Sequence, residues 1–235
     1  MMSKSCAISC RNWSTAKLPT EQLVVLYEDD ALLVLEKPAG LLSVPGRGPD
    51  KQDCLSERTR QIYPDALVVH RLDMATSGLM LMARGKTVQR IVSQMFAARS
   101  IAKTYVALVH GCPQASVANW NLIDLPIALD WPARPRRVID PVLGKPSQTR
   151  WRLLSTTRAD AAAVAPTSRI ELEPVTGRSH QLRVHLHAIG HTIVGDRLYG
   201  AEPVPAPRLM LHACALRLMH PVTGAALQWY SAPEF

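Results

Sequence analysis

Three segments of the chain collect side chains that can do chemistry where the hydrophobic periodicity is broken: residues 70–78, 103–105 and 176–191. In the first, Asp73 follows a short apolar run and precedes Thr76-Ser77-Gly78. A carboxylate held in such a loop serves as a nucleophile or general base when a cationic partner keeps it ionised. The alternative is a turn-capping Asp that binds its own backbone, which is the commoner use of such a residue.

Arg183 is the expected cationic partner of Asp73. The stretch Arg178–Ile189 predicts a helix that ends at Gly190. On this helix His180, Arg183 and His187 share one face, opposite an apolar face formed by Leu182, Leu186 and Ile189. The alternative roles for Arg183 are a surface ion pair or a phosphate contact.

The third segment also contains four histidines, at positions 180, 185, 187 and 191. His187 and His191 have the i, i+4 spacing of zinc ligands, which makes a metallohydrolase one alternative. The run has no Glu, however, and Gly190 interrupts the pair. We therefore expect no metal site.

The elements that must position these residues alternate between hairpins and isolated helices. The apolar runs Leu23–Tyr27 and Ala31–Lys37 flank an acidic turn and predict a β-hairpin. Helices are predicted from an N-capping Asp53 to Tyr63 and over Lys86–Arg99. In the second, apolar residues recur at helical spacing and should pack inward as one stripe: Val88, Ile91, Val92, Met95 and Phe96. Further strands are predicted at Ala66–Val69, Leu79–Ala83, Lys103–His110, Gln148–Leu154, Ser168–Glu173, Leu209–Met219 and Ala226–Tyr230. This order favours an α+β fold, with Trp131–Lys145 as a long basic loop.

Composition places the chain among globular proteins. It has 235 residues, of which 47% are hydrophobic and 20% charged, which excludes a disordered or collagen-like chain. No apolar run reaches the roughly 18 residues of a membrane span. The five cysteines are scattered, which favours reduced thiols and a cytoplasmic location. Residues 1–20 lack the apolar core of a secretory signal, so we expect a flexible lead-in.

The net charge of +8 is concentrated in two segments. Residues 58–103 hold eight basic and two acidic side chains, and residues 131–152 hold six and one. Such basic surfaces attract phosphate backbones, although they can also simply solvate two faces of a protein. Because the two segments bracket Asp73 and Tyr105, we expect them to form a docking rim for a polyanion.

Four motifs, in order along the chain, resemble those of RluA-type pseudouridine synthases. They are Lys37-Pro38-Ala39-Gly40-Leu41, His70-Arg71-Leu72-Asp73 with Ser77-Gly78, Lys103-Thr104-Tyr105, and the run from Gly177 to His185. The resemblance implies one catalytic domain over residues 21–235, without an S4 RNA-binding domain. It also implies a mixed, mostly antiparallel central β-sheet flanked by helices and loops.

The same resemblance implies isomerisation of uridine to pseudouridine in RNA without a cofactor or metal. Asp73 would attack the ribose carbon or the uracil ring, or remove a ribose proton, and Arg183 would pair with it. Tyr105, otherwise a core tyrosine, would stack on the uracil and assist the final proton removal. Arg71 would fill the gap left by the flipped nucleotide. Further RNA contacts are expected from His70, Arg178, His180, Arg134, Arg136 and Arg137.

The segments 41–47, 70–78 and 176–185 are most similar to dual-specificity members of that family. This implies, as RNA partners of a monomeric enzyme, a uridine at position 746 of 23S rRNA and one at position 32 of tRNA anticodon stem-loops. RNA loops are recognised by shape and splayed bases, which lets one enzyme serve two RNAs. The alternatives are a single-target enzyme and a non-catalytic RNA-binding relative.

Overall fold

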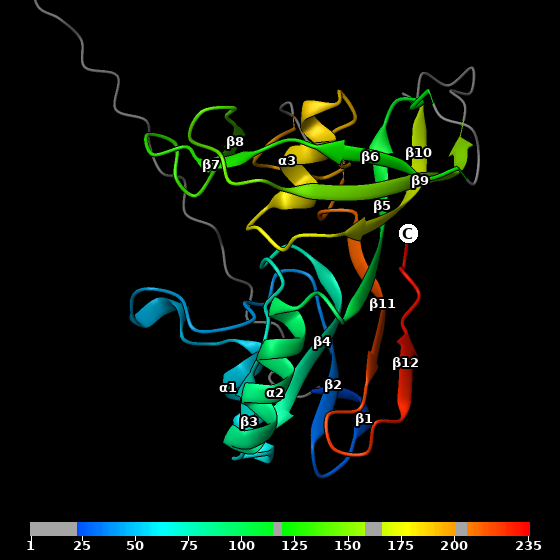
Figure 1. Cartoon of the computed structure of the whole chain (residues 1–235). Coiled ribbons are helices and arrows are strands. Elements are labelled where there is room, and N and C mark those ends of the chain that lie inside the picture. Colours follow the sequence, from blue (N-terminus) through cyan, green and yellow to red (C-terminus); the bar gives the residue numbers. More distant parts are fainter. Residues whose placement is uncertain (1–22, 115–118, 158–165, 201–205) are drawn as a thin grey trace, which may run out of the picture.

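A ten-stranded sheet organises the computed structural model, which describes residues 23–114, 119–157, 166–200 and 206–235 (Figure 1). The strands run in the order β1-β2-β4-β11-β5-β10-β9-β6, with β3 beside β4 and β12 beside β11. Only β4 and β11 pair in parallel among these strands, which confirms the expected mixed, mostly antiparallel α+β sheet. The predicted lead-in at residues 1–20 lies outside the described residues.

The bounds of the sheet strands are β1 Val24–Glu28, β2 Leu32–Lys37, β3 Ala66–Val68, β4 Ser77–Arg84, β5 Ala102–His110, β6 Asn121–Asp124, β9 Gln148–Thr157, β10 Thr167–Pro174, β11 Leu211–Met219 and β12 Ala226–Tyr230. The predicted hairpin is confirmed as β1 and β2. Its turn is fixed by the Asp29 carboxylate, which accepts hydrogen bonds from the amides of Ala31 and Leu32. An acidic residue at this position therefore closes the turn.

The described residues form three α-helices that pack on the sheet: α1 (Leu55–Ile62), α2 (Gly85–Ala97) and α3 (Gln181–Ala188). The predicted cap of α1 is wrong, because Cys54 occupies the N-cap position and the Asp53 carboxylate binds the Arg58 guanidinium at 2.7 Å. The predicted start of α3 at Arg178 is three residues early. His180 has a left-handed backbone with φ of 57°, so the chain enters the helix only after it.

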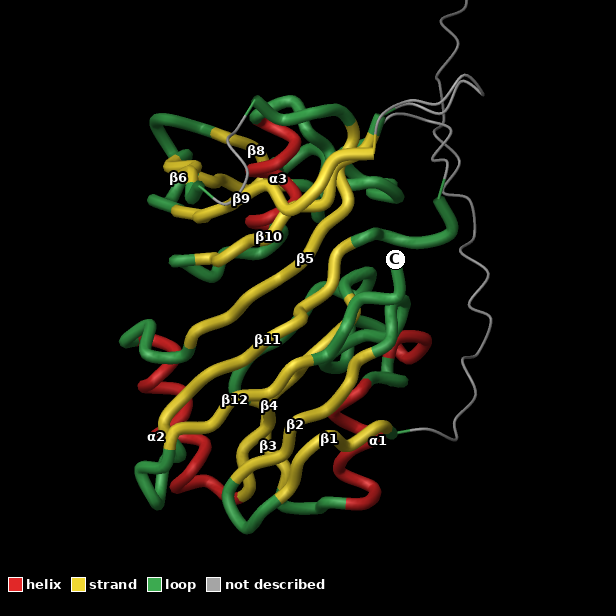
Figure 2. The backbone as a smooth tube through the Cα atoms, turned by 90° about the vertical axis from the view of Figure 1, so that its right-hand side faces the viewer, coloured by secondary structure: helices red, strands yellow, loops and turns green. Residues whose placement is uncertain are grey.

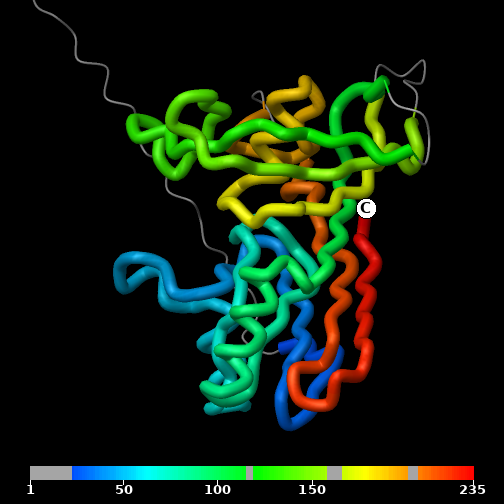
Figure 3. The backbone as a smooth tube through the Cα atoms, in the orientation of Figure 1, coloured from blue at the N-terminus to red at the C-terminus, as the bar shows by residue number. Residues whose placement is uncertain are grey.

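The predicted basic loop at 131–145 contains a strand that we did not expect. β8 (Arg137–Ile139) pairs with β7 (Ile127–Leu129) in a separate two-stranded sheet. Only three residues form this strand, and prolines and arginines flank them. The apolar–polar alternation that predicts a strand is therefore not recognisable there. Figure 3 shows this hairpin and the loop around the 3-10 helix η1 (Pro49–Lys51) extending to the same side of the molecule.

The long strands β5 and β11 connect a lower half, which holds α1 and α2, to an upper half, which holds α3 (Figure 2). As predicted, α2 packs one stripe inward, with Val88, Val92, Met95 and Phe96 against β2, β4 and β11. Gly78 is required where β4 meets β11, since a Cβ there would lie 2.3 Å from the carbonyl oxygen of Ala213. The close approach of these strands fixes where the loop before β4 ends.

The cysteines in the described part of the chain, Cys54, Cys112 and Cys214, are free. None of the helices there is long and apolar enough to cross a membrane.

Candidate active site

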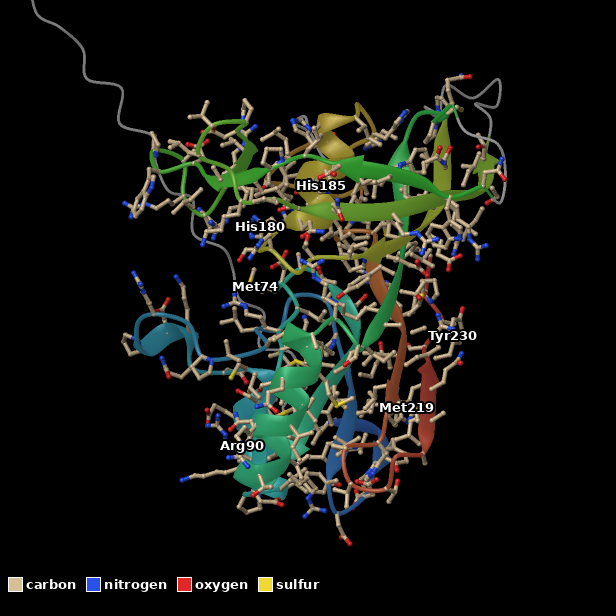
Figure 4. All side chains as sticks on the ribbon, in the orientation of Figure 1. Met74, Arg90, His180, His185, Met219 and Tyr230 are labelled. Atoms are coloured by element: carbon tan, nitrogen blue, oxygen red, sulfur yellow. The ribbon has the colours of Figure 1, made fainter. Side chains whose placement is uncertain are left out.

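The three segments selected from the sequence meet around one cavity of about 910 Å³. Its lining comes from the loop before β4, the C-terminal end of α2, the start of β5 and residues 173–183. Met74, next to Asp73, and His180 lie on the facing edges of the lower and upper halves (Figure 4). Asp73, Tyr105 and Arg183 all line this cavity, so the fold brings together the three predicted catalytic residues.

The loop that carries Asp73 is held by the segment 37–43. Ser43 Oγ donates to the carbonyl of Leu72 at 2.7 Å and accepts from its amide at 3.0 Å. The fully buried Lys37 donates to the carbonyls of Pro38, Leu41 and Met74. The backbone on both sides of Asp73 is therefore fixed by side chains more than 25 positions away.

The Asp73 side chain remains 22% exposed and faces the cavity. No backbone amide of the described residues donates to its carboxylate, so the alternative of a turn-capping Asp is not what the structure contains. Its cationic neighbour is Arg183, whose Nη1 lies 3.8 Å from Oδ2 of Asp73. Opposite charges at this distance attract each other.

Arg183 makes its hydrogen bonds to a different residue, Asp196. Nε and Nη2 of Arg183 each donate to a carboxylate oxygen of Asp196 at 2.7 Å. Both side chains are buried, so the alternative of a surface ion pair is wrong. Although burial alone would lower the pKa of Arg183, the hydrogen bonds and charge of Asp196, together with the charge of Asp73, raise it. Arg183 therefore stays protonated beside Asp73.

Asp196 is the residue that sequence reasoning missed. It follows Gly195, and its Oδ1 also accepts the amides of Leu198 and Tyr199 at 3.0 and 3.2 Å. The sequence offers one signal for such a residue. Arg183 lies on a predicted helix, and if its guanidinium is buried it requires an acidic partner. Which acid supplies it depends on a contact 13 positions away.

Tyr199, also missed, joins the predicted polar face of α3 to β8. The rings of His180 and His187 lie 6.0 and 5.9 Å from its ring, and the Arg183 guanidinium lies 5.2 Å away. The three side chains therefore lie together around Tyr199, as predicted, but His180 precedes the helix and is not on its face. The Tyr199 hydroxyl accepts the amide of Arg137 at 2.8 Å.

The backbone before α3 is held by Gln181. Its Oε1 accepts hydrogen bonds from the Thr176 hydroxyl and the Arg178 amide, and its Nε2 donates to Gln148 and Thr149. This connection fixes the exposed Arg178 at the edge of the cavity. It also explains why the helix begins at Gln181.

Tyr105 and His70 form an apolar wall of the cavity. Burial, reinforced by the charge of Asp73, raises the pKa of Tyr105 well above its ordinary value. Burial and the charge of Lys103 lower the pKa of His70 to about 3. The neutral His70 packs against Phe96, and its Nε2 accepts the amide of Leu81 at 2.9 Å.

The predicted RNA-binding residues fall into two groups. His70, Arg71, Arg178 and His180 line the cavity. Arg134, Arg136 and Arg137 do not; they lie on or beside β8, where Arg134 packs over Trp131 and Arg136 over Tyr199. Of the expected basic segment 58–103, only Arg71, Arg99 and Lys103 line the cavity, so the prediction that the whole segment forms the rim is wrong. Its other arginines include three that pair with acidic side chains elsewhere: Arg58, Arg60 and Arg84.

The four histidines considered as metal ligands have separate partners. His180 contacts Tyr199, His185 contacts Thr149 and Leu125, His187 contacts Thr192, and His191 contacts the carbonyl of His110. Within the described ranges no group of three His, Cys, Asp or Glu side chains could hold a metal ion. The donor set thus offers no support for the metallohydrolase alternative.

Comparisons with known proteins agree with this geometry. The sequence profile of the RNA pseudouridylate synthases matches residues 31–188. A protein of Escherichia coli O6:H1 named dual-specificity RNA pseudouridine synthase RluA is 44% identical, over 91% of this chain and 94% of its own. A protein of the same name from Vibrio vulnificus is 45% identical, over 84% of this chain and 78% of its own.

Solved structures show the same fold. Human RNA pseudouridylate synthase domain containing 1 superposes with a TM-score of 0.75 at 30% identity, covering 92% of this chain and 85% of that one. Human RNA pseudouridylate synthase domain containing 4 superposes with a TM-score of 0.66 at 24% identity, covering 89% and 88%.

Proposed function

The chain belongs to the RNA pseudouridylate synthase family and is an RNA-modifying isomerase, and we propose that the cavity at Asp73 is where it converts uridine into pseudouridine. The observation that carries this assignment is the position of Asp73: its carboxylate faces the cavity from a loop with a fixed backbone, and it lies beside the buried Arg183. The reaction breaks the bond between ribose C1′ and uracil N1 and joins C1′ to C5. The C5 proton leaves and N1 gains one, so substrate and product are isomers.

Each catalytic residue has a role in this proposal. Asp73 supplies the carboxylate that starts cleavage of the glycosidic bond, and Arg183 pairs with that carboxylate. Tyr105 stacks on the uracil and assists removal of the C5 proton. Its raised pKa leaves the hydroxyl neutral, which suits an aromatic ring that packs against a base.

RNA reaches the cavity only if the target nucleotide leaves its stack, since the reacting bond is otherwise covered. Arg71 is exposed and lines the cavity beside Asp73, which suits it to fill the vacated space. Arg178 and His180 border the cavity from the opposite half, while His70 supports its wall. Arg134, Arg136 and Arg137 add contacts to RNA outside the cavity.

The substrates we propose are structured loops of two RNA classes. The relatives named dual-specificity enzymes support this choice, because the chain matches them over most of its length. In detail we propose uridine 746 of 23S rRNA and uridine 32 of tRNA anticodon stem-loops. The free cysteines support a cytoplasmic enzyme, and we propose that residues 21–235 act as one catalytic domain in a monomer.

Substitution of Asp73 by Asn tests the site and the substrates together. We expect pseudouridine formation in transcripts of both RNA classes to fall by roughly 10³-fold or more, since the amide cannot act as nucleophile or base. RNA affinity changes little. Asp65→Asn is the matched control, because Asp65 is exposed and pairs with Arg84 outside the cavity.

Retained turnover in Asp73→Asn would contradict the site assignment. Wild-type activity on only one of the two transcripts would remove the dual specificity. RNA binding without turnover by the wild-type protein would favour the non-catalytic alternative.

A further inference from the structure

Lys103 is a cation in the cavity that the roles above leave unused. It is the second residue of β5, is partly buried, and lines the cavity two positions before Tyr105. Its ammonium lies 5.9 Å from the Phe96 ring centre and 4.0 Å from the place a Cβ on Gly177 would take. No carboxylate of the described residues lies within salt-bridge distance of it.

The other basic side chains of the cavity are compensated in ways that Lys103 is not. Arg150 pairs with Glu173 at 2.9 Å, and Arg183 pairs with Asp196. The remaining four are exposed to water: Arg71, Arg99, Arg178 and Arg217. Lys103 alone of these seven described cations is partly buried without an acidic partner. His70 nearby carries no compensating charge, because it is neutral.

This arrangement is unfavourable for the protein alone. Removing an ammonium from water destabilises its charged form unless an anion or hydrogen-bond acceptors replace the lost hydration. The direction of its pKa agrees, since burial lowers it. A ligand that brings negative charge next to Lys103 would therefore stabilise the charged ammonium, and this would strengthen binding of the ligand.

RNA offers two kinds of acceptor here: neutral atoms of the bases and the ribose, and the charged phosphodiester oxygens. Only the phosphate compensates a whole charge. Residues two apart on a strand point to the same face, about 7 Å from each other, which is comparable to the separation of a base from its own phosphate. Tyr105 and Lys103 thus match the two ends of one nucleotide.

We propose that Lys103 binds a phosphodiester oxygen of the RNA backbone next to the uridine that occupies the cavity. The proposal rests on the proposed function for its ligand, and it assigns Lys103 to positioning of the flipped nucleotide. The exposed cations Arg99 and Arg178 lie around the same cavity and favour the same backbone.

The test is the salt dependence of RNA binding, measured as the Kd of an anticodon stem-loop transcript in the Asp73→Asn background so that no turnover occurs. Lys103→Met keeps an apolar stem against Phe96 and removes the charge. We expect weaker binding and a slope of log Kd against log salt that is shallower by about 0.7–0.9, the value for one lost phosphate contact. Lys103→Arg should preserve the slope.

Lys86→Met is the matched control, because Lys86 is exposed at the start of α2, about 15 Å from Phe96 along that helix. It loses the same charge and should keep the parental slope. Arg90, on the same helix, also lies away from Met74 and His180 (Figure 4). Lys103→Gln provides a second charge-removing variant if melting curves show that the Met variant does not fold.

A slope equal to the parent's with weaker binding would place Lys103 against a neutral base and overturn the proposal. Unchanged binding would overturn it as well, as would a slope in Lys103→Arg as shallow as in Lys103→Met. These outcomes are independent of turnover, so they differ from a failure of the proposed activity.

Discussion

At the residue scale, Asp196 explains how a guanidinium can lie buried beside Asp73. The bidentate pair satisfies Nε and Nη2 of Arg183 and leaves Nη1 directed toward Asp73 at 3.8 Å. A planar guanidinium can bind one carboxylate with two donors while presenting another donor elsewhere, whereas an ammonium cannot. Arg183 therefore interacts with two carboxylates at once, those of Asp196 and Asp73.

Substitution of Asp196 by Asn is expected to lower the free energy of unfolding by about 3–5 kcal/mol, since it leaves the Arg183 charge buried without its partner. Urea denaturation of the purified protein measures this loss. The exposed pair of Asp65 and Arg84 provides the control, for which Asp65→Asn should cost no more than about 1 kcal/mol. Equal losses in the two variants would show that the Asp196 pair does not stabilise the fold.

At the element scale, the catalytic loop is connected to three neighbours. Segment 37–43 binds its backbone at Leu72 and Met74, and the parallel pairing of β4 with β11 fixes its end at Ser77 and Gly78. His70 connects its start to the middle of β4 through the Leu81 amide. The loop is therefore held at its start, in its middle and at its end, although it has no regular secondary structure.

The His70 connection makes a pH-dependent prediction. An unprotonated Nε2 is needed to accept the Leu81 amide, and the pKa is lowered to about 3 in the folded protein. Between about pH 6.5 and pH 3 the unfolded chain binds a proton here that the folded chain does not. The contribution of neutral His70 to the free energy of unfolding is therefore complete above pH 6.5. It decreases as the pH falls, by up to about 1.4 kcal/mol per pH unit.

Unfolding free energies of the wild type and His70→Gln, measured from pH 7 to pH 4, check this prediction. The glutamine oxygen can accept the same amide and does not titrate. The difference in stability between the two proteins should shift in favour of the variant as the pH falls. A constant difference would show that His70 titrates normally in the folded state.

At the scale of the whole molecule, two groups of basic side chains are the proposed RNA-binding surfaces. One is the cavity, where seven basic residues face Asp73 and Glu173. The other is the β7–β8 hairpin with Arg134, Arg136 and Arg137, which extends beyond the cavity on the same side as the loop around η1 (Figure 3). We propose that one RNA contacts both surfaces.

Replacing Arg134 and Arg136 by Gln is expected to weaken binding of all tested RNAs by a similar factor and to make the salt slope shallower by up to about two, because phosphate contacts carry no sequence information. Lys86→Gln with Arg90→Gln removes the same charge from the exposed face of α2. Titrations of a 23S rRNA fragment and a tRNA stem-loop at several salt concentrations compare the pairs. Indistinguishable slopes would remove the hairpin from the RNA-binding surface.

Sequence patterns predicted the family, the α+β fold, the hairpin of β1 and β2, the inward stripe of α2 and the grouping of Arg183 with His187 on one face of α3. Each of these features depends on residues that are close together along the chain, so periodicity and motif spacing predict it. The errors also concern neighbouring residues. Asp53 does not cap α1, because its carboxylate pairs with Arg58, and the strand β8 was not predicted because prolines surround it.

The tertiary structure alone decided the partners. Periodicity shows which face of α3 is polar but not that Asp196 and Tyr199 cover it, and it places Lys103 beside Tyr105 without showing that no acid reaches it. Likewise, Lys37 and Ser43 hold a loop about 30 positions away. Such contacts depend on how strands far apart in sequence are ordered in the sheet, and a buried charge takes its partner from whatever that order brings within reach.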